Sequence, residues 1–193
     1  MKLETDVIAM ARIANSLKKD VTSKQDMVDW TGSPFAWIKE QPSRRIGKIG
    51  ELIVEKWCRS RKFEVTQSPD SEADRVVAGI RVEVKLSTLW QKGYFKFQQI
   101  RDQNYDAIWL LGVGPGFVRN WLVPKSVVQT HVIGKLGQHT GSEGTETAWL
   151  SIIPGQEPDW IKPYGSSLTV VCRQLRLLSS GKLASQETHF GSS

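Results

Sequence analysis

The sequence predicts a single α/β domain, of the α+β kind, in which helices flank a central sheet. Residues 107–113 form an uninterrupted apolar run between turn signals, which is typical of a strand buried on both faces. Residues 80–86 alternate strictly between apolar and polar side chains, as in a strand with one buried face. Residues 44–61 carry apolar side chains at helical spacing. A long helix, a hairpin and a buried strand therefore form the expected core.

The chain of 193 residues is long enough for one well-packed domain and too short for two. We expect that domain to span residues 1–179, beginning with a helical N-terminal extension over residues 1–43. The polar residues 180–193 predict a disordered tail. Within the extension, we expect helices over residues 3–18 and from about residue 22 to 30, for packing or dimer contact, and a short helical turn over residues 35–39.

The composition favours an anionic partner. The formal net charge is +6 and the sequence pI is about 9.4, although only 24% of the residues are charged, so nucleic acid is the simplest partner. Cys58 and Cys172 lack the spacing of a metal site and are expected to be free thiols in a reducing compartment. Neither a signal peptide nor an apolar run of membrane-spanning length is present, which predicts a cytoplasmic protein.

The hairpin over residues 74–86 carries the candidate chemistry. Ala78 and Gly79 supply its turn, and side chains repeat every two residues along a strand, so Glu83 and Lys85 share one face. The hairpin also folds Asp74 back beside them. Two carboxylates suit Mg²⁺, which is usually held by one or two carboxylates, water and substrate phosphate oxygens. The alternative is a solvent-exposed strand whose charged side chains do not form a functional site.

Two further acids are weighed with this hairpin. Glu51 lies in the helix over residues 44–61, off the apolar stripe of that helix, while Gly47 and Gly50 lie close to the stripe. Two interior glycines indicate close approach by another backbone or by a ligand, since each costs about 1 kcal/mol against alanine. Asp70 is an alternative to Asp74 as the first acid of the hairpin, and the sequence leaves that choice open.

The remaining elements follow the hairpin in order. We expect a loop, a third strand over residues 94–98, a turn or helix ending near residue 106, and the buried strand. A returning strand over residues 118–123 and a short helix or turn at residue 124 lead into a flexible loop over residues 131–147. A late strand over residues 149–153 and a C-terminal helix over residues 168–178 complete the domain.

The joint spacing of these acidic and basic positions resembles the PD-(D/E)XK nuclease superfamily, over about residues 44–123. The resemblance implies a restriction-endonuclease-like αβββαβ core with a mixed sheet, followed by a recognition and packing region over residues 124–179. It implies that Asp74 and Glu83 bind Mg²⁺, that Lys85 is the catalytic lysine, and that Glu51 supports a metal or its water. Gln99, or Gln98, stands where several branches carry an active-site glutamine. The middle segment is similar to type II restriction enzymes in particular.

The resemblance implies a Mg²⁺-dependent endonuclease that cuts double-stranded DNA, with a homodimer as the expected form. Base readout falls to parts outside the core, and basic side chains of the entry segment suit phosphates. The residues expected to contact DNA are Lys39, Arg44, Arg45, Lys48, Arg119, His131, Lys135 and His139. A structure-specific or repair nuclease of the same fold and a catalytically silent DNA-binding module remain alternatives.

Overall fold

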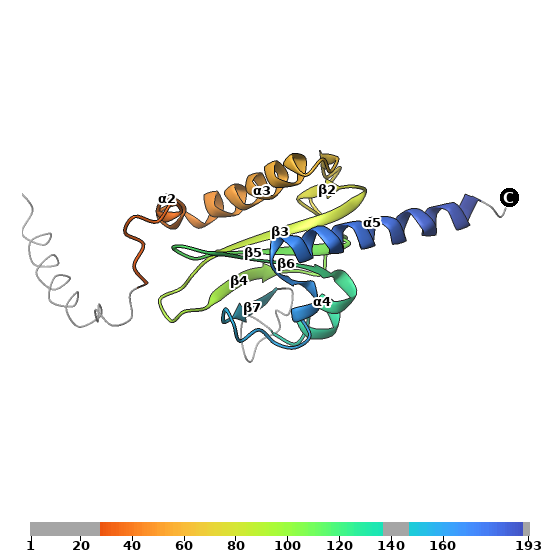
Figure 1. Cartoon of the computed structure of the whole chain (residues 1–193). Coiled ribbons are helices and arrows are strands. Elements are labelled where there is room, and N and C mark those ends of the chain that lie inside the picture. Colours follow the sequence, from red (N-terminus) through yellow and green to blue (C-terminus); the bar gives the residue numbers. More distant parts are fainter. Residues whose placement is uncertain (1–27, 137–146, 191–193) are drawn as a thin grey trace, which may run out of the picture.

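The computed structural model describes residues 28–136 and 147–190, with side chains described as far as residue 181 (Figure 1). The helices expected over residues 3–18 and 22–30 lie almost wholly outside this range, and so does His139. The helices are α2 Ala36–Lys39, α3 Ser43–Ser60, α4 Lys125–His131 and α5 Leu168–Phe190, with a 3-10 turn η2 at Lys162–Tyr164. The strands are β1 Val65–Gln67, β2 Arg75–Val77, β3 Ile80–Thr88, β4 Phe95–Ile100, β5 Ala107–Val113, β6 Val118–Pro124, β7 Ala148–Ile152 and β8 Gly165–Ser166.

A mixed sheet of six strands, in the order β1-β2-β3-β5-β6-β8, forms the centre of the molecule. Its neighbouring strands are antiparallel except for β3 and β5, which run parallel. As the sequence predicts, every residue of β5 is buried. The expected fold class, a mixed central sheet flanked by helices, is therefore confirmed.

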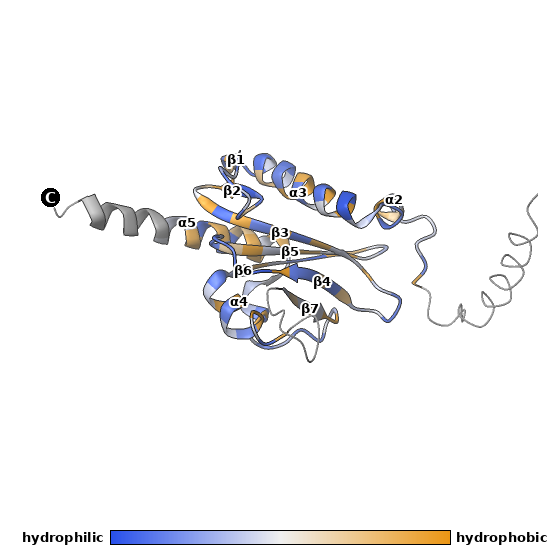
Figure 2. Ribbon diagram, turned by 180° about the vertical axis from the view of Figure 1, so that it is seen from behind, coloured by the Kyte–Doolittle hydropathy of each residue, from blue (hydrophilic) through white to orange (hydrophobic). Residues whose placement is uncertain are grey.

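Helices α3 and α5 cover one face of this sheet, and β4, β7 and α4 cover the other (Figures 1 and 2). On the first face, Val54 and Cys58 of α3 and Val171 of α5 pack with side chains of β3 and β5. On the second face, Phe95 and Phe97 of β4 pack around Trp121 of β6, with ring centroids 6.3 Å and 6.2 Å from the indole. Two apolar layers thus enclose the sheet.

The third strand of the predicted core is not part of the central sheet. β4 instead pairs with β7 in a separate two-stranded sheet. Parallel strands need a crossover connection, which is usually a helix. Here β4 makes that crossover between β3 and β5, and the segment of residues 101–106 contains no helix. Its backbone is bound instead by side chains: Arg81 and Lys125 donate to the carbonyl oxygens of Asn104 and Gln103.

Three other expectations are corrected. The helix α5 continues to Phe190, so residues 180–190, expected as a disordered tail, are helical. His131 is the last residue of α4 and not part of a loop. The apolar spacing of residues 44–61 predicts a sheet-facing stripe that includes Ile53, but Val54 and Cys58 face the sheet instead and Ile53 is exposed. Among the described helices, none combines the length and the apolar composition that a membrane span requires.

Candidate active site

The hairpin of β2 and β3 forms as predicted. Ala78 and Gly79 both have positive φ, 49° and 79°, which is the backbone of the two-residue turns that match strand twist. β2 pairs with β3 only as far as Val82, so the edge of β3 from Glu83 onward has no strand beside it. Asp74 takes that place: its N–H donates to Val82 O (3.1 Å) and its carboxylate accepts from the N–H of Val84 (2.7 Å). The chain therefore fixes Asp74 beside Glu83.

Glu83 and Lys85 share one face of β3, as the strand period predicts. Lys85 Nζ lies 2.7 Å from Glu83 Oε1, and both Asp74 and Glu83 line the same cavity. Burial raises the pKa of Asp74, and the negative charge of Glu51 raises it further. Burial also raises the pKa of Glu83; Lys85 opposes this shift and Asp74 adds to it. These two acids therefore lie where a bound cation would be strongly stabilising.

Glu51 reaches the same place from α3, but cations already hold its carboxylate. Arg75 Nη1 lies 3.0 Å from Glu51 Oε2, and Lys48 Nζ lies 2.7 Å from the same oxygen. Arg75 is buried, and its Nε contacts Glu55 Oε2 at 2.9 Å. In the described part of the chain, no three Asp, Glu, His or Cys side chains gather closely enough to hold a metal ion. Glu51 thus lines the same cavity as Asp74 and Glu83, but its carboxylate is bound to Arg75.

Helix α3 comes close to β3 at a glycine. A Cβ on Gly50 would lie 2.8 Å from Cβ of Leu86, whereas a Cβ on Gly47 would meet nothing within 4 Å. Gly47 lines the cavity described below. The expected close approach therefore occurs at Gly50 alone, and it sets the distance between Glu51 and the hairpin.

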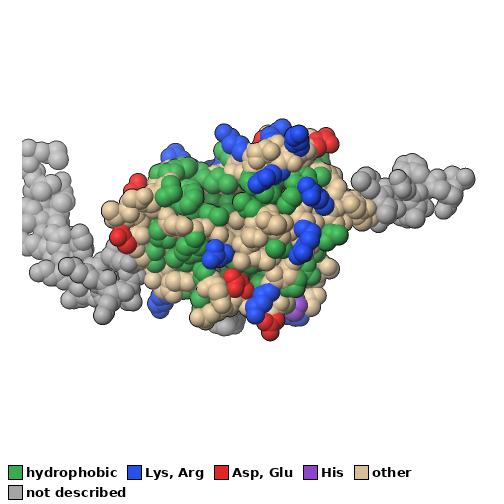
Figure 3. Space-filling model, viewed as in Figure 1, with side chains coloured by type: hydrophobic (Ala, Val, Ile, Leu, Met, Phe, Trp, Pro, Cys, Tyr) green, Lys and Arg blue, Asp and Glu red, His purple; other side chains and the backbone are tan. Residues whose placement is uncertain are grey.

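A cavity of about 690 Å³ opens over the exposed edge of β3, between α3 and β4. Glu51, Asp74 and Glu83 are its acids, and Lys39, Arg44, Lys85 and Lys96 are its cations. A second cavity of about 530 Å³ lies between α3 and α5; it contains Arg61, Arg173 and Arg176 but no acid. Basic side chains gather over α3 and α5 on the face shown in Figure 3. Only the first of these two cavities combines carboxylates with cations.

Both glutamines of β4 line the first cavity. The pairing of β4 with β7 shifts between Phe97 and Ile100, so Gln98 and Gln99 lie opposite the single residue Trp149. Such a bulge bends a strand and redirects its side chains, and Gln99 has a φ of 55°. Phe97 and Ile100 consequently both stay buried while both glutamines are exposed. The sequence left the choice between Gln98 and Gln99 open, and the bulge brings both to the cavity.

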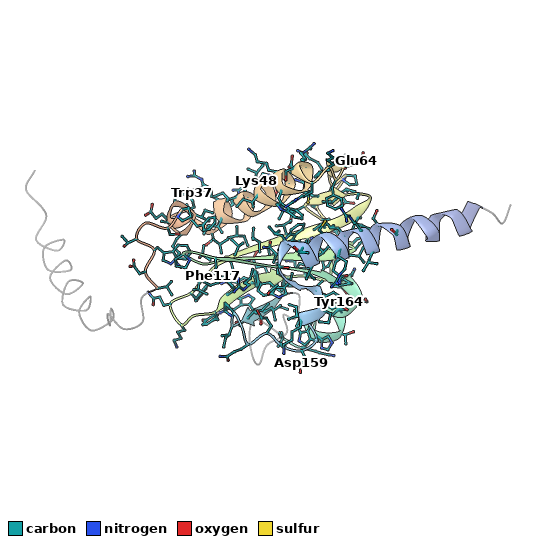
Figure 4. All side chains as sticks on the ribbon, in the orientation of Figure 1. Trp37, Lys48, Glu64, Phe117, Asp159 and Tyr164 are labelled. Carbon is teal, nitrogen blue, oxygen red and sulfur yellow. The ribbon has the colours of Figure 1, made fainter. Side chains whose placement is uncertain are left out.

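The other predicted residues divide into two groups. Lys39 and Arg44 line the cavity, and Arg45 and Lys48 are exposed on α3, where Figure 4 labels Lys48. Arg119, His131 and Lys135 do not line it. Arg119 lies over the Phe117 ring, His131 stacks on Trp160 with centroids 4.9 Å apart, and Lys135 donates to Thr130 O. Of the predicted DNA-contacting residues, Lys39, Arg44 and Lys48 thus adjoin the acids.

Asp70, the alternative first acid, is outside the cavity. Its carboxylate pairs with Arg81 at 2.5 Å and accepts from the N–H of Glu72. These bonds lower the pKa of Asp70, with Arg81 contributing most. Asp74 is therefore the acid that joins Glu83. The sequence did not identify Arg75, Trp90 or Lys96 as site residues. Their place in the site depends on contacts between elements that are separate in the sequence.

Similarity to known proteins is found among solved structures alone. No protein-family model and no curated protein matches the sequence. Among solved structures, a bacterial homing endonuclease, I-Ssp6803I, aligns with a TM-score of 0.45 and 15% identity, covering 74% of this chain and 94% of that one. The function of this chain is accordingly inferred from its own residues.

Proposed function

We propose that this chain is a Mg²⁺-dependent DNA endonuclease of the PD-(D/E)XK type, which hydrolyses phosphodiester bonds in double-stranded DNA. One observation carries the proposal: Asp74, Glu83 and Lys85 converge on the open edge of β3, inside a cavity whose remaining cations are Lys39, Arg44 and Lys96. An acid pair suits a hard cation, and the surrounding cations suit the phosphates of the substrate.

The chemistry of the two carboxylates fits Mg²⁺. Asp74 and Glu83 offer hard oxygen ligands, and burial disfavours the negative charge of each and raises its pKa. Mg²⁺ keeps several waters and is bound through one or two carboxylates together with substrate phosphate oxygens, so two acids suffice. When bound, the ion would polarise the phosphoryl group and lower the pKa of an attacking water.

The side chains around this pair have separate roles in the proposal. Lys85 is held 2.7 Å from Glu83, where its ammonium orients a water or offsets the charge that develops on the phosphate. Gln98 and Gln99 offer amide donors and acceptors on the opposite side of the cavity. Glu51 fixes Arg75 and thereby the start of β2, which carries Asp74 into place.

The basic side chains next to the acids support DNA as the substrate. Lys39 and Arg44 line the cavity, and Arg45 lies one residue further along α3. Such cations bind phosphates, which set the position of a duplex and make its affinity depend on salt. We propose further that the protein is cytoplasmic, acts as a homodimer, and cuts at a short symmetric site in the manner of type II restriction enzymes.

Digestion of DNA tests this proposal. Plasmid and phage genomic DNA are incubated with the purified protein, in Mg²⁺ or in chelator, and the products are separated on a gel. The proposal predicts discrete fragments in Mg²⁺ and intact DNA in chelator. A smear that depends on metal would contradict sequence-specific cutting and indicate a structure-specific or nonspecific nuclease. Retarded but uncut DNA in Mg²⁺ would contradict hydrolysis and leave a DNA-binding module.

A further inference from the structure

The exposed indole of Trp90 lines the cavity of the candidate active site. Trp90 lies in the loop between β3 and β4, which is closed by bonds from Trp90 N to Tyr94 O and from Gly93 N to Trp90 O, each 2.9 Å long. The ring of Trp90 stacks on Tyr94, with centroids 5.7 Å apart and planes 23° apart. Trp90 is nevertheless 38% exposed and lines the cavity that contains Glu83. A large apolar ring is thus held in place at the cavity without being buried.

A lysine beside this indole has no acidic partner among the residues that the structure describes. Lys96 Nζ lies 3.7 Å from the centroid of the Trp149 ring and 5.2 Å from that of Trp90. Within residues 28–136 and 147–181, no carboxylate lies within ion-pair distance of Lys96, which lines the same cavity. Aromatic rings attract a cation but do not neutralise it. The ammonium is therefore placed to bind an anion that enters the cavity.

The proposed cleavage step gives no role to Trp90, and it includes Lys96 only as one of the cations that line the cavity. Asp74, Glu83 and Lys85 are on the hairpin of β2 and β3, whereas Trp90 and Lys96 are on the loop and strand that follow. The cavity that joins the two groups has a volume of about 690 Å³. This is within the range of pockets that hold small organic molecules, so it has room for a nucleotide beside the phosphate that is cut.

We propose that Trp90 and Lys96 form a subsite for one nucleotide of the substrate strand, next to the phosphodiester that is cleaved. Lys96 binds a phosphate of that nucleotide, and Trp90 stacks on its base, which is displaced from the double helix. A flat aromatic ring next to a free cation is how proteins bind single-stranded nucleic acid. The inference rests on the proposed function, and it adds that the enzyme needs an unstacked base at the cut.

Binding without cleavage tests the role of Trp90. Affinity for a labelled single-stranded oligonucleotide is measured by fluorescence anisotropy in chelator, for the full chain and for Trp90→Ala and Trp90→Phe. We expect Trp90→Ala to weaken binding by about 5- to 150-fold, which is the effect of removing one aromatic ring on which a base stacks, and Trp90→Phe to restore most of the affinity. The control is Trp37→Ala: Trp37 is 52% exposed on α2 and does not line the cavity, and it should bind like the wild type (Figure 4).

An abasic site moved along the oligonucleotide identifies the stacked base. At one position the missing base should weaken binding by the wild type as much as Trp90→Ala does on the intact strand. At that position Trp90→Ala should lose nothing more, because the contact is already absent. The stacking contact would be overturned if the abasic site weakened binding equally at every position and Trp90→Ala always added its full loss of affinity to that effect.

The salt dependence of binding tests Lys96. Removing one phosphate contact should reduce the slope of log affinity against log salt by about 0.7 for a single strand, so Lys96→Met should show that change. Lys92→Met is the matched control, because Lys92 is an exposed lysine of the loop just before β4 and does not line the cavity. Equal slopes for Lys96→Met and Lys92→Met would overturn the phosphate contact.

The outcome for this subsite is separable from that for the proposed function. If the wild type cuts plasmid in Mg²⁺ but Trp90→Ala binds as tightly as the wild type, the subsite is wrong and the nuclease stands. If the stacking contact is found and no Mg²⁺-dependent cutting occurs, hydrolysis is wrong and the binding subsite stands. A wild type that neither binds nor cuts DNA overturns both.

Discussion

Arg75 Nη1 lies 3.0 Å from Oε2 of Glu51, and this contact ties the strand that follows Asp74 to helix α3. The guanidinium is buried, and the side chain of Glu51 is only 18% exposed. Arg75 also contacts Glu55 and donates to the carbonyl oxygen of Asp74 at 2.6 Å. One arginine therefore positions both the backbone of Asp74 and the carboxylate of Glu51.

Replacing Arg75 by methionine should destabilise the protein by about 2–3 kcal/mol. Removing one partner of a buried ion pair costs about 3–5 kcal/mol, and the partial exposure of Glu51 and Glu55 reduces that figure. Urea unfolding measures the free energy. The control is Lys48→Met, which removes a 56% exposed partner of the same Glu51 and should cost less than about 0.5 kcal/mol. Equal losses for the two variants would contradict the special role of Arg75.

Two glycines of α3 should respond to alanine in opposite directions. Gly50→Ala should cost about 1–3 kcal/mol, because its Cβ would lie 2.8 Å from Cβ of Leu86 and push α3 away from β3. Gly47→Ala should stabilise the helix by up to about 1 kcal/mol, because a Cβ there meets nothing within 4 Å. Thermal unfolding of both variants checks this, and a stabilising Gly50→Ala would show that α3 does not approach β3 so closely.

The pair of acids should make the metal-free protein less stable as pH rises. The ordinary pKa values are 3.8 for Asp74 and 4.5 for Glu83, and both are raised in the folded chain. From about pH 4 up to the raised values, the folded state binds more protons than the unfolded state. The free energy of unfolding contributed by these acids therefore falls across that window and stays lower above it.

Asp74→Asn isolates this effect, because an asparagine oxygen can still accept from the N–H of Val84 without a charge. In chelator the melting temperature of the variant should match the wild type near pH 4 and exceed it at pH 8. Mg²⁺ should then stabilise the wild type and not the variant. A variant that is less stable than the wild type at every pH would contradict the repulsion between the acids.

Features that follow from local periodicity could be predicted from the sequence. The common face of Glu83 and Lys85 follows from the two-residue repeat of a strand, and the return of Asp74 follows from the short turn at Ala78 and Gly79. Contacts between distant elements could not be predicted. The ion pairs of Arg75 depend on how α3 packs, and Lys96 is next to Trp149 only because β4 pairs with β7.

The pairing of β4 also explains the main difference in topology. Alternation predicts a strand near residues 94–98 but not its partner, since β4 would show the same pattern in the central sheet or in a separate one. The bulge at Gln98 and Gln99 lengthens β4 to Ile100 and leaves six residues before β5, too few for a helix with a buried face. Pairing and bulge both depend on β7, which lies some fifty residues further along the chain.

Plasmid cleavage by Glu83→Ala, beside the wild type and Asp70→Ala, tests the assignment of the active site most directly. All three proteins are assayed in Mg²⁺ for cutting and in chelator for DNA retardation on a gel. We expect Glu83→Ala to retard DNA without cutting it, as Lys85→Ala should. We expect Asp70→Ala to cut like the wild type, because Asp70 is paired with Arg81 outside the cavity. Full cleavage by Glu83→Ala would contradict the proposed active site.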